Sequence, residues 1–586
     1  MEFSIDLLGD IKTEKEAKQL GDKGLGNLLI LLLIFRNLEN GNLLIEDTVI
    51  IPENISNEKK NPNCIGFDLD EEWMLTDLIK LQVITGAPDC ALLLAKLFRE
   101  KTKKSAQKEI NALVVELGLT ESCCKNISGR KKRNDPQSYT INDIKTIAKE
   151  FSKLSSKYQQ YLTTSEISFK GRLYKNISKV FQEGKVVLGL FWDKKNGFLI
   201  REENVLVVLE ADNEFELNDT FYLLLEDKEK PRKEKFKQKV FSKSNINVAI
   251  LGDTYLGEWY AAHRKRLGRW DPIIDEGYDY SFESVKSLIS GADFKIANFE
   301  AVLVKDLSSS PLKRVKKFVL GADIEETTAV LQRQSIDLVT LATNHIKDYG
   351  QDGVFQTIQA LKDKKIAYIG CDETVAGAIA PFRLKTKTQE VFIFNAYWYK
   401  RYQYQVTDTY AIGESSGAAC ISNRFCEKIS EVKQAHPNSK VIVIPHWGID
   451  FRPIQAYQRE NARRLVEAGA DLIIGHGPHA LQPAGKINDT DILYSIGNFV
   501  FNSDGEYKAN PTALPYGAIV NLTFKGNSLH AHLKFIGTNN LKTKWVPKEV
   551  TIEEFQEITE AFKKEKCLDM GWEINEQEKE ITKKIW

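Results

Sequence analysis

The sequence predicts an α/β fold for the C-terminal half of the chain, preceded by a mostly helical domain and a small β-rich module. Three observations support this prediction. From residue 246 to about residue 535, strand-like apolar runs alternate with helix-like segments, a pattern typical of α/β sheet proteins. Residues 1–163 carry apolar side chains at helical spacing, whereas residues 164–227 contain short β-like runs separated by turn residues.

Length and composition are those of a soluble globular protein with several domains. The chain has 586 residues, of which 42% are hydrophobic and 28% are charged. Lysine plus arginine equals aspartate plus glutamate at 81 each, so the overall charge gives no strong nucleic-acid signal but is compatible with a local basic patch. The longest apolar run, Leu28 to Phe35, is far shorter than the roughly 20 residues of a membrane-spanning helix. We therefore expect a core helix or buried strand there, no transmembrane segment and a cytoplasmic protein.

The predicted N-terminal domain, residues 1–163, combines three helical stretches with a basic loop. The loop, Gly129 to Arg133, is better explained as a solvated charge run than as a nucleic-acid contact. No residue pattern in this domain indicates chemistry, so a recognition role toward a protein partner or a nucleic acid stays open. The helical stretches cover Glu71–Glu100 with a break at Gly86-Ala87-Pro88, then Ser105–Leu119, and Asn142–Tyr161.

Four further segments complete the predicted organisation. Residues 164–227 form the β-rich module, and the charged residues 228–245 form a linker. The α/β domain covers residues 246–545, and residues 546–586 form a helical tail that opens with the capping-box pattern Thr551–Glu554. Within the α/β domain the predicted helices are Ser281–Ser290, Val354–Lys364 and Arg459–Ala468. The predicted strands are Val248–Leu251, Phe294–Ala297, Leu338–Leu341, Ile366–Ile369, Val391–Phe394, Val441–Ile444 and Asp471–Ile474.

Five predicted strands of the α/β domain end in polar residues that suit a metal site. All eight histidines lie beyond residue 262, and a histidine alone is more often structural than a ligand, but several at successive strand ends indicate one assembled site. Nitrogen and oxygen ligands without a thiolate suit Mn, Fe or Zn, and two such ions can activate a water molecule. The polar residues are Asp253, Asn298, Glu300, Asn344, His345, His446, His476 and His479.

Two other groups of residues are predicted to support this site. Asp348 is placed to hydrogen-bond His345 from behind. An aromatic and basic segment follows the strand-like run Val391–Phe394, and it suits either a substrate wall that attracts an anionic polymer or phosphate, or a packed loop. The wall residues are Trp398, Lys400 and Arg401.

The motifs, in their order along the chain, resemble those of the CapA/PgsA family over about residues 246–535. Members of this family are poly-γ-glutamate capsule biosynthesis proteins related to calcineurin-like metallophosphoesterases. The motifs that carry the resemblance are Gly252-Asp253, Asn298-x-Glu300, Asn344-His345-x-x-Asp348-x-Gly350, His446-Trp447-Gly448, Gly475-His476-x-Pro478-His479 and Tyr494-Ser495-Ile496-Gly497-Asn498-Phe499.

The resemblance implies a four-layer αββα sandwich, metallophosphoesterase-like, with a site for two divalent metal ions at one edge. It also implies that His345 is the catalytic acid or stabilises the transition state, with Asp348 as its partner. The metal ligands that it implies are Asp253, Asn344, His446, His476 and His479, with Asn298 or Glu300 supplying another.

Four departures from the family pattern concern the metal ligands. Tyr255 stands where metallophosphoesterases usually have a histidine two places after the aspartate, and Gly477 stands where the family often has a third histidine. His476 and His479 are separated by two residues instead of one. Asp450 replaces the glutamate common after the His-Trp-Gly motif. The metal position that a histidine at residue 255 would complete therefore has one ligand fewer.

Two functions are compatible with these residues. The first is a metal-dependent hydrolase of the metallophosphoesterase type that acts by metal-activated water on a phosphoester or on an anionic, poly-γ-glutamate-like polymer. The alternative is a non-catalytic accessory protein that binds polymer or metal during capsule polymer synthesis or handling. A catalytic hydrolase requires bound divalent metal and a functional His345, whereas the accessory role does not require His345.

Overall fold

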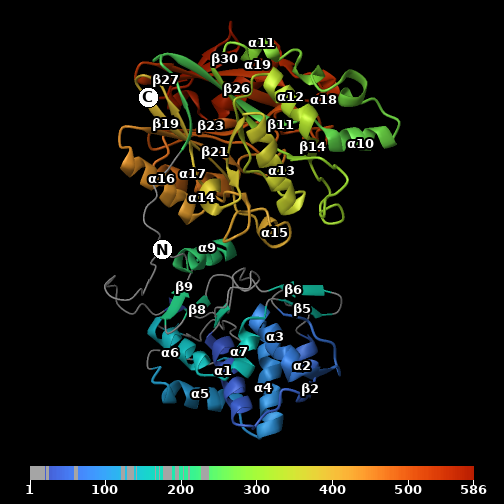
Figure 1. Ribbon diagram of the computed structural model, residues 1–586, viewed down its shortest axis with the longest axis vertical. Helices are drawn as coiled ribbons and strands as arrows, with labels where there is room; N and C mark the ends of the chain where they lie inside the picture. Colours follow the sequence, from blue (N-terminus) through green and yellow to red (C-terminus); the bar gives the residue numbers. More distant parts are fainter. Residues whose placement is uncertain are drawn as a thin grey trace. The chain divides into compact units, whose positions relative to one another are not determined.

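In the computed structural model the chain divides into two compact units, Met1–Glu229 and Lys230–Trp586 (Figure 1). The domain boundaries predicted from the sequence stay predictions, and the basic loop 129–133 and residues 228–235 of the linker lie outside the described residues. The structure describes residues 20–21, 25–57, 64–119, 124, 126–127, 138–139, 141–164, 166–169, 172–175, 188–191, 197–201, 204–208, 211–225 and 236–586.

The first unit is built around helix α1 (Leu25–Glu39), which is apolar on nearly all sides. Its residues Leu28 to Phe35 are all buried, so the longest apolar run of the sequence is a core helix. Among the described residues, no helix is both long and apolar enough to cross a membrane. The other helices are α2 (Glu53–Ser56), α3 (Leu75–Thr85), α4 (Pro88–Thr102), α5 (Ala106–Glu116), α6 (Ile141–Ser152) and α7 (Ser156–Leu162).

Helix boundaries in this unit follow local backbone chemistry. The break between α3 and α4 is confirmed, because Gly86 adopts a left-handed conformation with φ 58° and Pro88 begins the next helix. The single helix predicted over Asn142–Tyr161 is wrong, because the chain leaves the helix after Ser152 and re-enters at Ser156. Short strand pairs join β1 (Leu20–Gly21) to β4 (Ser138–Tyr139) and β2 (Thr48–Ile50) to β3 (Glu72–Met74).

The β-like runs after residue 164 form antiparallel strands, and a helix follows them. Strands β5 (Glu166–Phe169) and β6 (Arg172–Lys175) pair with each other. A separate three-stranded sheet contains β7 (Leu188–Phe191), β8 (Gly197–Arg201) and β9 (Asn204–Val208). Helix α9 (Glu214–Leu225) lies within residues 164–227, where the sequence predicted a β-rich module and no helix.

The second unit contains two large mixed sheets, and the predicted α/β class is confirmed. The ten-stranded sheet runs in the order β16 (Ala367–Ile369), β15 (Leu338–Thr340), β12 (Phe294–Phe299), β11 (Ile246–Tyr255), β26 (Tyr516–Lys525), β27 (Ser528–Gly537), β30 (Glu580–Lys584) and β29 (Glu573–Asn575), with β25 (Asn498–Phe501) beside β11 and β28 (Lys548–Glu549) beside β27. The seven-stranded sheet runs in the order β10 (Lys237–Val240), β18 (Phe382–Lys385), β19 (Glu390–Tyr397), β21 (Lys440–His446), β22 (Leu472–Ile474), β24 (Thr490–Ile496) and β23 (Leu481–Ile487).

An apolar layer separates the two sheets. Successive residues of a strand point to opposite faces, so Ile393 of β19 joins Ile250 of β11 in the layer between the sheets. The next residue, Phe394, points away from this layer and packs instead with Phe425 and Leu465 of two helices. The fold therefore has a sheet-on-sheet core with helices covering the outer face of the seven-stranded sheet.

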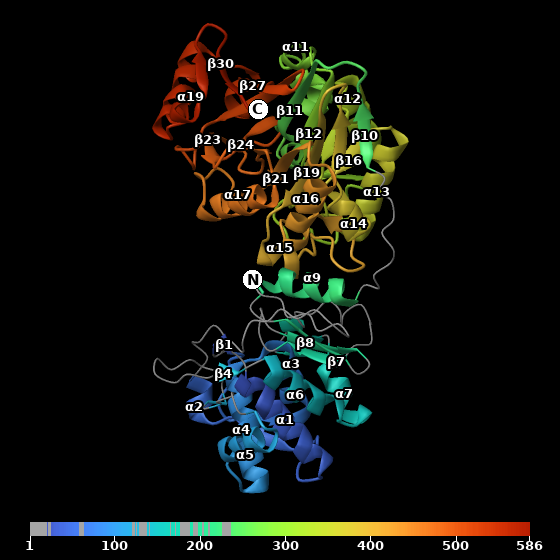
Figure 2. The same cartoon turned by 90° about the vertical axis from the view of Figure 1, so that its left-hand side faces the viewer.

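The helices on that outer face are α16 (Asn423–Ala435) and α17 (Ala456–Ala468), which lie side by side in Figure 2. Helix α13 (Gly350–Asp363) contacts β16 at the edge of the ten-stranded sheet and packs beside α12 (Ile324–Arg333). The remaining helices are α10 (Glu258–Arg266), α11 (Lys286–Ile289), α14 (Val375–Ala378), α15 (Arg401–Gln405), α18 (Asn540–Thr543) and α19 (Ile552–Lys564), and two short strand pairs join β13 (Val302–Val304) to β14 (Gly321–Asp323) and β17 (Cys371–Asp372) to β20 (Gly417–Ala418).

Two segments of this unit differ from the prediction. The helix predicted over Ser281–Ser290 is a short 3₁₀ turn followed by the four-residue helix α11. The tail begins with the predicted helix α19, whose capping box at Thr551 and Glu554 is confirmed. Beyond α19 the tail departs from the prediction, because a short 3₁₀ turn (Leu568–Met570) is followed by β29 and by β30, which pairs with β27 and extends the ten-stranded sheet.

Burial strongly perturbs the carboxyl group of Glu258, at the start of α10. Its Oε1 accepts hydrogen bonds from Asp323 N and Thr327 Oγ1, both at 3.1 Å, while its Oε2 has no partner among the described residues. Burial raises the pKa of Glu258 to about 7, against the lowering effect of these hydrogen bonds.

We expect Glu258→Gln to change the pH dependence of stability. The pKa of Glu258 in the folded state lies above its ordinary value of 4.5, so the folded protein keeps a proton on Glu258 that the unfolded chain has lost. The free energy of unfolding of the parent protein therefore falls as pH rises from about 4.5 to about 7. Over this window the variant should gain on the order of 3 kcal/mol relative to the parent protein. The urea unfolding midpoint at pH 5, 6, 7 and 8 measures this gain. The exposed Glu325→Gln serves as control, and parallel pH profiles for all three proteins would refute the expectation.

Candidate metal centre

The polar residues predicted at strand ends converge where the two sheets meet. Asp253 and Asn298 lie at the ends of the parallel strands β11 and β12, and Asn344 follows β15. From the other sheet, His446 ends β21 and pairs through a parallel bridge with His476, which follows β22. The convergence is the expected result of parallel strands that deliver their carboxyl ends to one edge.

Asp253 and Asn298 form a hydrogen-bonded pair near the carboxyl ends of β11 and β12. Asn298 Nδ2 donates to Asp253 Oδ1 at 2.8 Å and lies 3.1 Å from Nδ1 of His446. Thr340 Oγ1 donates to Asn298 Oδ1 at 2.8 Å, which fixes the amide. His446 Nε2 lies 3.0 Å from Asn344 Oδ1. Side chains from three strands of one sheet are thus linked to a histidine of the other.

Glu300 lies at the centre of the cluster and is buried without a hydrogen-bond partner. Its backbone N donates to Thr254 O at 3.0 Å, which places the residue directly beyond β12. The side chain is 1% exposed, and neither carboxylate oxygen has a hydrogen-bond partner in the described part of the chain. The Oε1 atom lies 3.7 Å from Nε2 of both His446 and His479 and 3.8 Å from Nε2 of His345. Three ring nitrogens thus surround one carboxylate oxygen.

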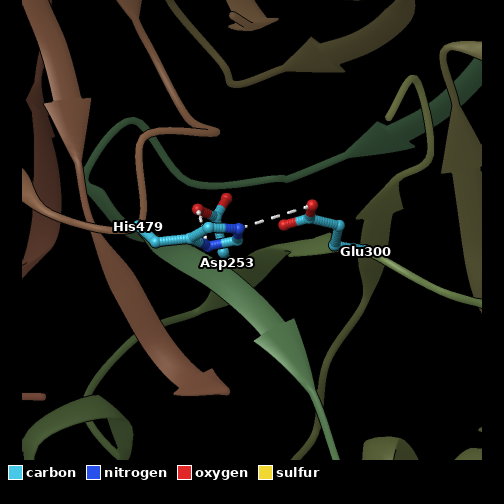
Figure 3. Close-up of side chains that lie close together, drawn as sticks. All are labelled: Asp253, Glu300 and His479. Atoms are coloured by element: carbon cyan, nitrogen blue, oxygen red, sulfur yellow. Dashed lines mark ion pairs between the residues drawn. The ribbon is translucent and has the colours of Figure 1, made fainter. Parts of the chain in front are cut away.

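His479 connects Glu300 to Asp253, as Figure 3 shows. Its Nδ1 lies 3.3 Å from Asp253 Oδ2 and 2.9 Å from Asn498 Oδ1, while its Nε2 faces Glu300. The backbone of His479 is left-handed, with φ 57°, a costly conformation for a residue with a side chain. Phe501, at a ring-centroid distance of 4.6 Å, packs against the imidazole and holds it in this direction.

The charges within the cluster shift the pKa values in opposite directions. Burial raises the pKa of Glu300 well above its ordinary value, whereas His479 and other histidines hold the pKa of Asp253 below its usual range despite burial. Burial lowers the pKa of His446 and lowers that of His476 to about 4. The pKa of His479 is raised against burial by Glu300 and Asp253. His446 and His476 are therefore neutral imidazoles near neutral pH, the form that binds metals.

The residues present fit a divalent cation. Asp253, Glu300 and His479 each offer one ligand atom, and these atoms lie within 4.8 Å of one another. Both ring nitrogens of His476 also lack a hydrogen-bond partner among described residues, although the side chain is 1% exposed. Buried polar atoms are normally hydrogen-bonded, and a divalent cation would supply a partner for the unpartnered atoms of Glu300 and His476.

Two charged residues, Asp348 and Lys316, orient His345 on its Nδ1 side. The sequence predicted Asp348 but not Lys316. The predicted contact to Asp348 is present, with 2.6 Å between His345 Nδ1 and Asp348 Oδ2. The missed residue is Lys316, whose Nζ donates to Asp348 Oδ1 at 2.5 Å and to Asn344 O at 3.0 Å. Burial and the charge of Lys316 lower the pKa of His345. The basic run Lys313 to Lys317 was the available sequence signal for Lys316.

The predicted wall residues divide into two kinds. Trp398 N donates to His446 O at 3.2 Å, and its ring stacks on Tyr457 with 4.0 Å between ring centroids. Lys400 is partly buried, and its Nζ lies 4.9 Å from the Trp398 ring. Arg401 is exposed at the start of α15. Trp398 and Lys400 thus border the cluster, whereas Arg401 lies on the surface beside them.

The structure explains two of the departures from the family pattern. The hydroxyl of Tyr255 donates to Gly321 O at 3.0 Å and accepts from Trp259 N at 2.7 Å, so this side chain points to other partners. A Cβ atom on Gly477 would lie 2.5 Å from Trp447 O and 3.1 Å from the His446 ring. A histidine at position 477 is therefore excluded by this backbone, and the cluster has fewer potential ligands than the family pattern implies.

Comparison with known proteins identifies the domain that carries this cluster. Residues 247–503 match the family described as "Bacterial capsule synthesis protein PGA_cap". These residues form a PGA_cap domain. Every one of the eight polar residues predicted at strand ends lies within it.

Two relatives are similar to part of this chain. "Capsule biosynthesis protein CapA" of Bacillus anthracis is 28% identical over 266 residues, which cover 44% of this chain and 60% of that protein. "PGA biosynthesis protein CapA" of Bacillus subtilis (strain 168) is 25% identical over 279 residues, which cover 45% of this chain and 66% of that protein. The chain thus spans less than two thirds of either relative.

Among solved structures, penicillin binding protein 5 from Haemophilus influenzae is similar with a TM-score of 0.32 and 13% identity, over 37% of this chain and 65% of that one. A likeness this low carries no argument about the fold.

We expect Gly477→Ala to destabilise the PGA_cap domain. Gly477 has φ 108°, and its N donates to Asp253 Oδ2 at 3.2 Å, so an added Cβ both strains the backbone and disturbs a cluster residue. The expected loss is about 2–3 kcal/mol in urea unfolding. Gly526→Ala is the matched control, because Gly526 also has positive φ (57°) but a Cβ there meets no atom within 4 Å. Its expected loss is about 1 kcal/mol, and equal losses would contradict the steric argument.

Proposed function

We propose that the PGA_cap domain is a metal-dependent hydrolase, built as a metallophosphoesterase-like four-layer sandwich, that cleaves a phosphoester or amide bond of an anionic substrate. The observation that carries this proposal is the position of Glu300. A buried carboxylate without a hydrogen bond is costly, yet its Oε1 lies within 3.8 Å of three imidazole nitrogens. Ligand atoms around one metal ion stand at comparable separations. The names of the two relatives support an anionic capsule polymer, a poly-γ-glutamate-like chain, as substrate.

Two groups of side chains would hold two divalent ions of Mn, Fe or Zn. Asp253, Glu300 and His479 would hold one ion, because their ligand atoms already lie together. The second ion would be held by Asn344, His446 and His476. Asn298 would keep Asp253 and His446 in position between the two ions. Because Tyr255 bonds elsewhere, one of the two positions has one ligand fewer than in the family pattern.

A divalent ion bound there would activate water and polarise the oxygen of the scissile bond. His345 is placed to handle the proton of the leaving group, because its Nε2 faces the cluster while its Nδ1 is 2.6 Å from Asp348. Asp348 and Lys316 orient the ring, and Leu320 N fixes Asp348 in turn by donating to its Oδ2 at 2.7 Å. Trp398, whose backbone N donates to His446 O and whose ring stacks on Tyr457, would border the bound substrate.

A non-catalytic accessory role is the second candidate, and Tyr255 is the observation that favours it. A site that lacks one ligand can bind a metal or an anionic polymer without turnover. The two candidates differ in their dependence on His345, because binding needs the ligands whereas hydrolysis also needs a group that handles a proton. A recognition role of the first unit toward a protein partner is compatible with both.

The metal-binding part of the proposal predicts that Glu300→Gln weakens binding of Mn²⁺ or Zn²⁺ by more than about tenfold. The substitution keeps the shape of the side chain and removes only its charge. Metal content of the purified protein and titration against a competing chelator measure the effect. Glu258→Gln is the matched control, because Glu258 is also a buried glutamate with one unpartnered oxygen but lies outside the cluster. A parent protein that takes up no Mn, Fe or Zn would overturn the proposal.

The catalytic part predicts that His345→Ala lowers kcat on a phosphodiester or phosphatase substrate by about 10²–10⁴-fold. Metal content should stay at the parent level, since Asp253, Glu300 and His479 are unchanged. His530→Ala is the control histidine, because His530 lies on β27 with Ser528 as its contact at 3.4 Å. Full activity in the His345 variant would favour the accessory role over the hydrolase.

A further inference from the structure

A row of basic side chains borders the metal centre and takes no part in the chemistry proposed for it. Three come from the loop before β14 and two from the start of α15. Four of the five are exposed, and the fifth, Lys400, is partly buried. We call these residues the basic strip: Lys313, Arg314, Lys317, Lys400 and Arg401.

The two segments of the basic strip are tied to each other. Tyr402 Oη donates to Val315 O at 3.0 Å, so the start of α15 lies directly against the loop that carries Lys313, Arg314 and Lys317. Both Tyr402 and Val315 are exposed, at 45% and 47%, and this contact therefore lies on the surface. The basic residues on either side of it form one continuous feature rather than two separate patches.

Each segment is also anchored to a residue of the metal centre. Lys316, in the middle of the loop, donates to Asn344 O at 3.0 Å and to Asp348 Oδ1 at 2.5 Å. Trp398, two residues before Lys400, donates through its backbone N to His446 O at 3.2 Å. The position of the strip relative to the metal centre is therefore fixed from both sides by hydrogen bonds.

The charge of Lys400 responds to both the metal centre and the loop. Burial lowers the pKa of Lys400, and the charge of Lys316 lowers it further. The carboxylates of Asp450 and Glu300 act in the opposite direction and raise it. A divalent cation beside Glu300 would cancel the attraction from that carboxylate. Asp450 would then be the acidic group that still acts on Lys400, and Asp306 acts on Lys313. The loop alone brings Lys313, Arg314 and Lys317 to the surface, so positive charge would still predominate on it beside the reaction centre.

The arrangement suits a chain with repeated anionic groups better than a single phosphate. One phosphate or carboxylate needs one or two cationic partners, whereas the strip offers five along a surface. Nucleic acid is less well matched, because tight binding uses roughly 6–10 phosphate contacts and stacking platforms for bases. The Trp398 ring already has Tyr457 stacked on one face.

We propose that the basic strip binds successive carboxylate groups of an extended polyanionic chain, on one side of the bond presented to the metal centre. Lys313, Arg314 and Lys317 are thereby specificity-determining residues that make the domain act on polymer in preference to small esters. The cleavage part of this statement rests on the proposed hydrolase function. The binding part stands separately, because a polycarboxylate can occupy the strip without turnover.

The test compares two triple variants of the full chain. In the first, Lys313→Gln, Arg314→Gln and Lys317→Gln remove charge from the strip. In the matched control, Lys525→Gln, Lys542→Gln and Lys548→Gln remove the same charge from exposed positions of the same unit outside the strip. All six side chains are exposed, so both variants should fold as the parent does.

Fluorescence anisotropy with labelled γ-linked glutamate oligomers of two to twenty units measures binding at two salt concentrations. For the parent protein we expect affinity to increase with oligomer length. For the strip variant we expect at least tenfold weaker binding of the twenty-unit chain, little change for the two-unit chain and a smaller salt dependence. The control should match the parent. Where hydrolysis is measurable, KM for polymer should rise in the strip variant while kcat for a small ester stays unchanged.

Three results would overturn the inference. The first is parent-like binding by the strip variant, and the second is equal loss in both triple variants, which would indicate a general charge effect. The third is tighter binding of a labelled single-stranded DNA of equal charge, which would assign the strip to nucleic acid. Failure of the hydrolase proposal is distinguishable, because it shows as absent metal uptake or full activity of His345→Ala while length-dependent binding through the strip persists.

Discussion

Side chains such as Ile250, Ile393 and Ile444 pack between the two sheets of the second unit, and this apolar layer determines where the strands can end. The layer excludes water along the length of the strands. Polar side chains can therefore face one another only where the strands of both sheets reach their carboxyl ends. Asp253 and Asn298 arrive from one sheet and His446 from the other, and hydrogen bonds between them join the two sheets at this edge. The site is thus a consequence of how the core packs.

The same burial makes the cluster unfavourable without a cation. Glu300 has no hydrogen-bond partner among the described residues, and the left-handed backbone of His479 is itself strained. Such costs persist where the surrounding structure enforces them, and they are common at functional sites. A bound divalent ion would compensate the carboxylate charge and give the unpartnered nitrogens of His476 a role. Metal binding and folding stability are then linked, because an ion that binds only the folded state stabilises it.

Sequence patterns predicted the members of the cluster better than its supporting contacts. Histidines and carboxylates at strand ends, such as His446 and Glu300, are recognisable because strand direction places them in space. Lys316 was missed, since its contact to Asp348 joins residues 32 positions apart through a loop without regular structure. For the fold, the alternation of strands and helices was sufficient to predict the α/β class. It could not predict that β30 returns after α19 to pair with β27, because short polar strands at a sheet edge have no distinctive pattern.

Equal numbers of basic and acidic residues in the whole chain conceal a local imbalance beside the metal centre. The loop that carries Lys313, Arg314 and Lys317 is joined to the segment with Lys400 and Arg401 by the hydrogen bond from Tyr402 Oη to Val315 O. Net charge is a property of composition, whereas a ligand responds mainly to the charges within about 8 Å of it at physiological salt. Buried carboxylates at the metal centre would attract cations, and the basic strip beside it would attract anions. An anionic chain held by the strip could approach the centre once a cation has neutralised Glu300, so cation binding would precede productive binding of polymer.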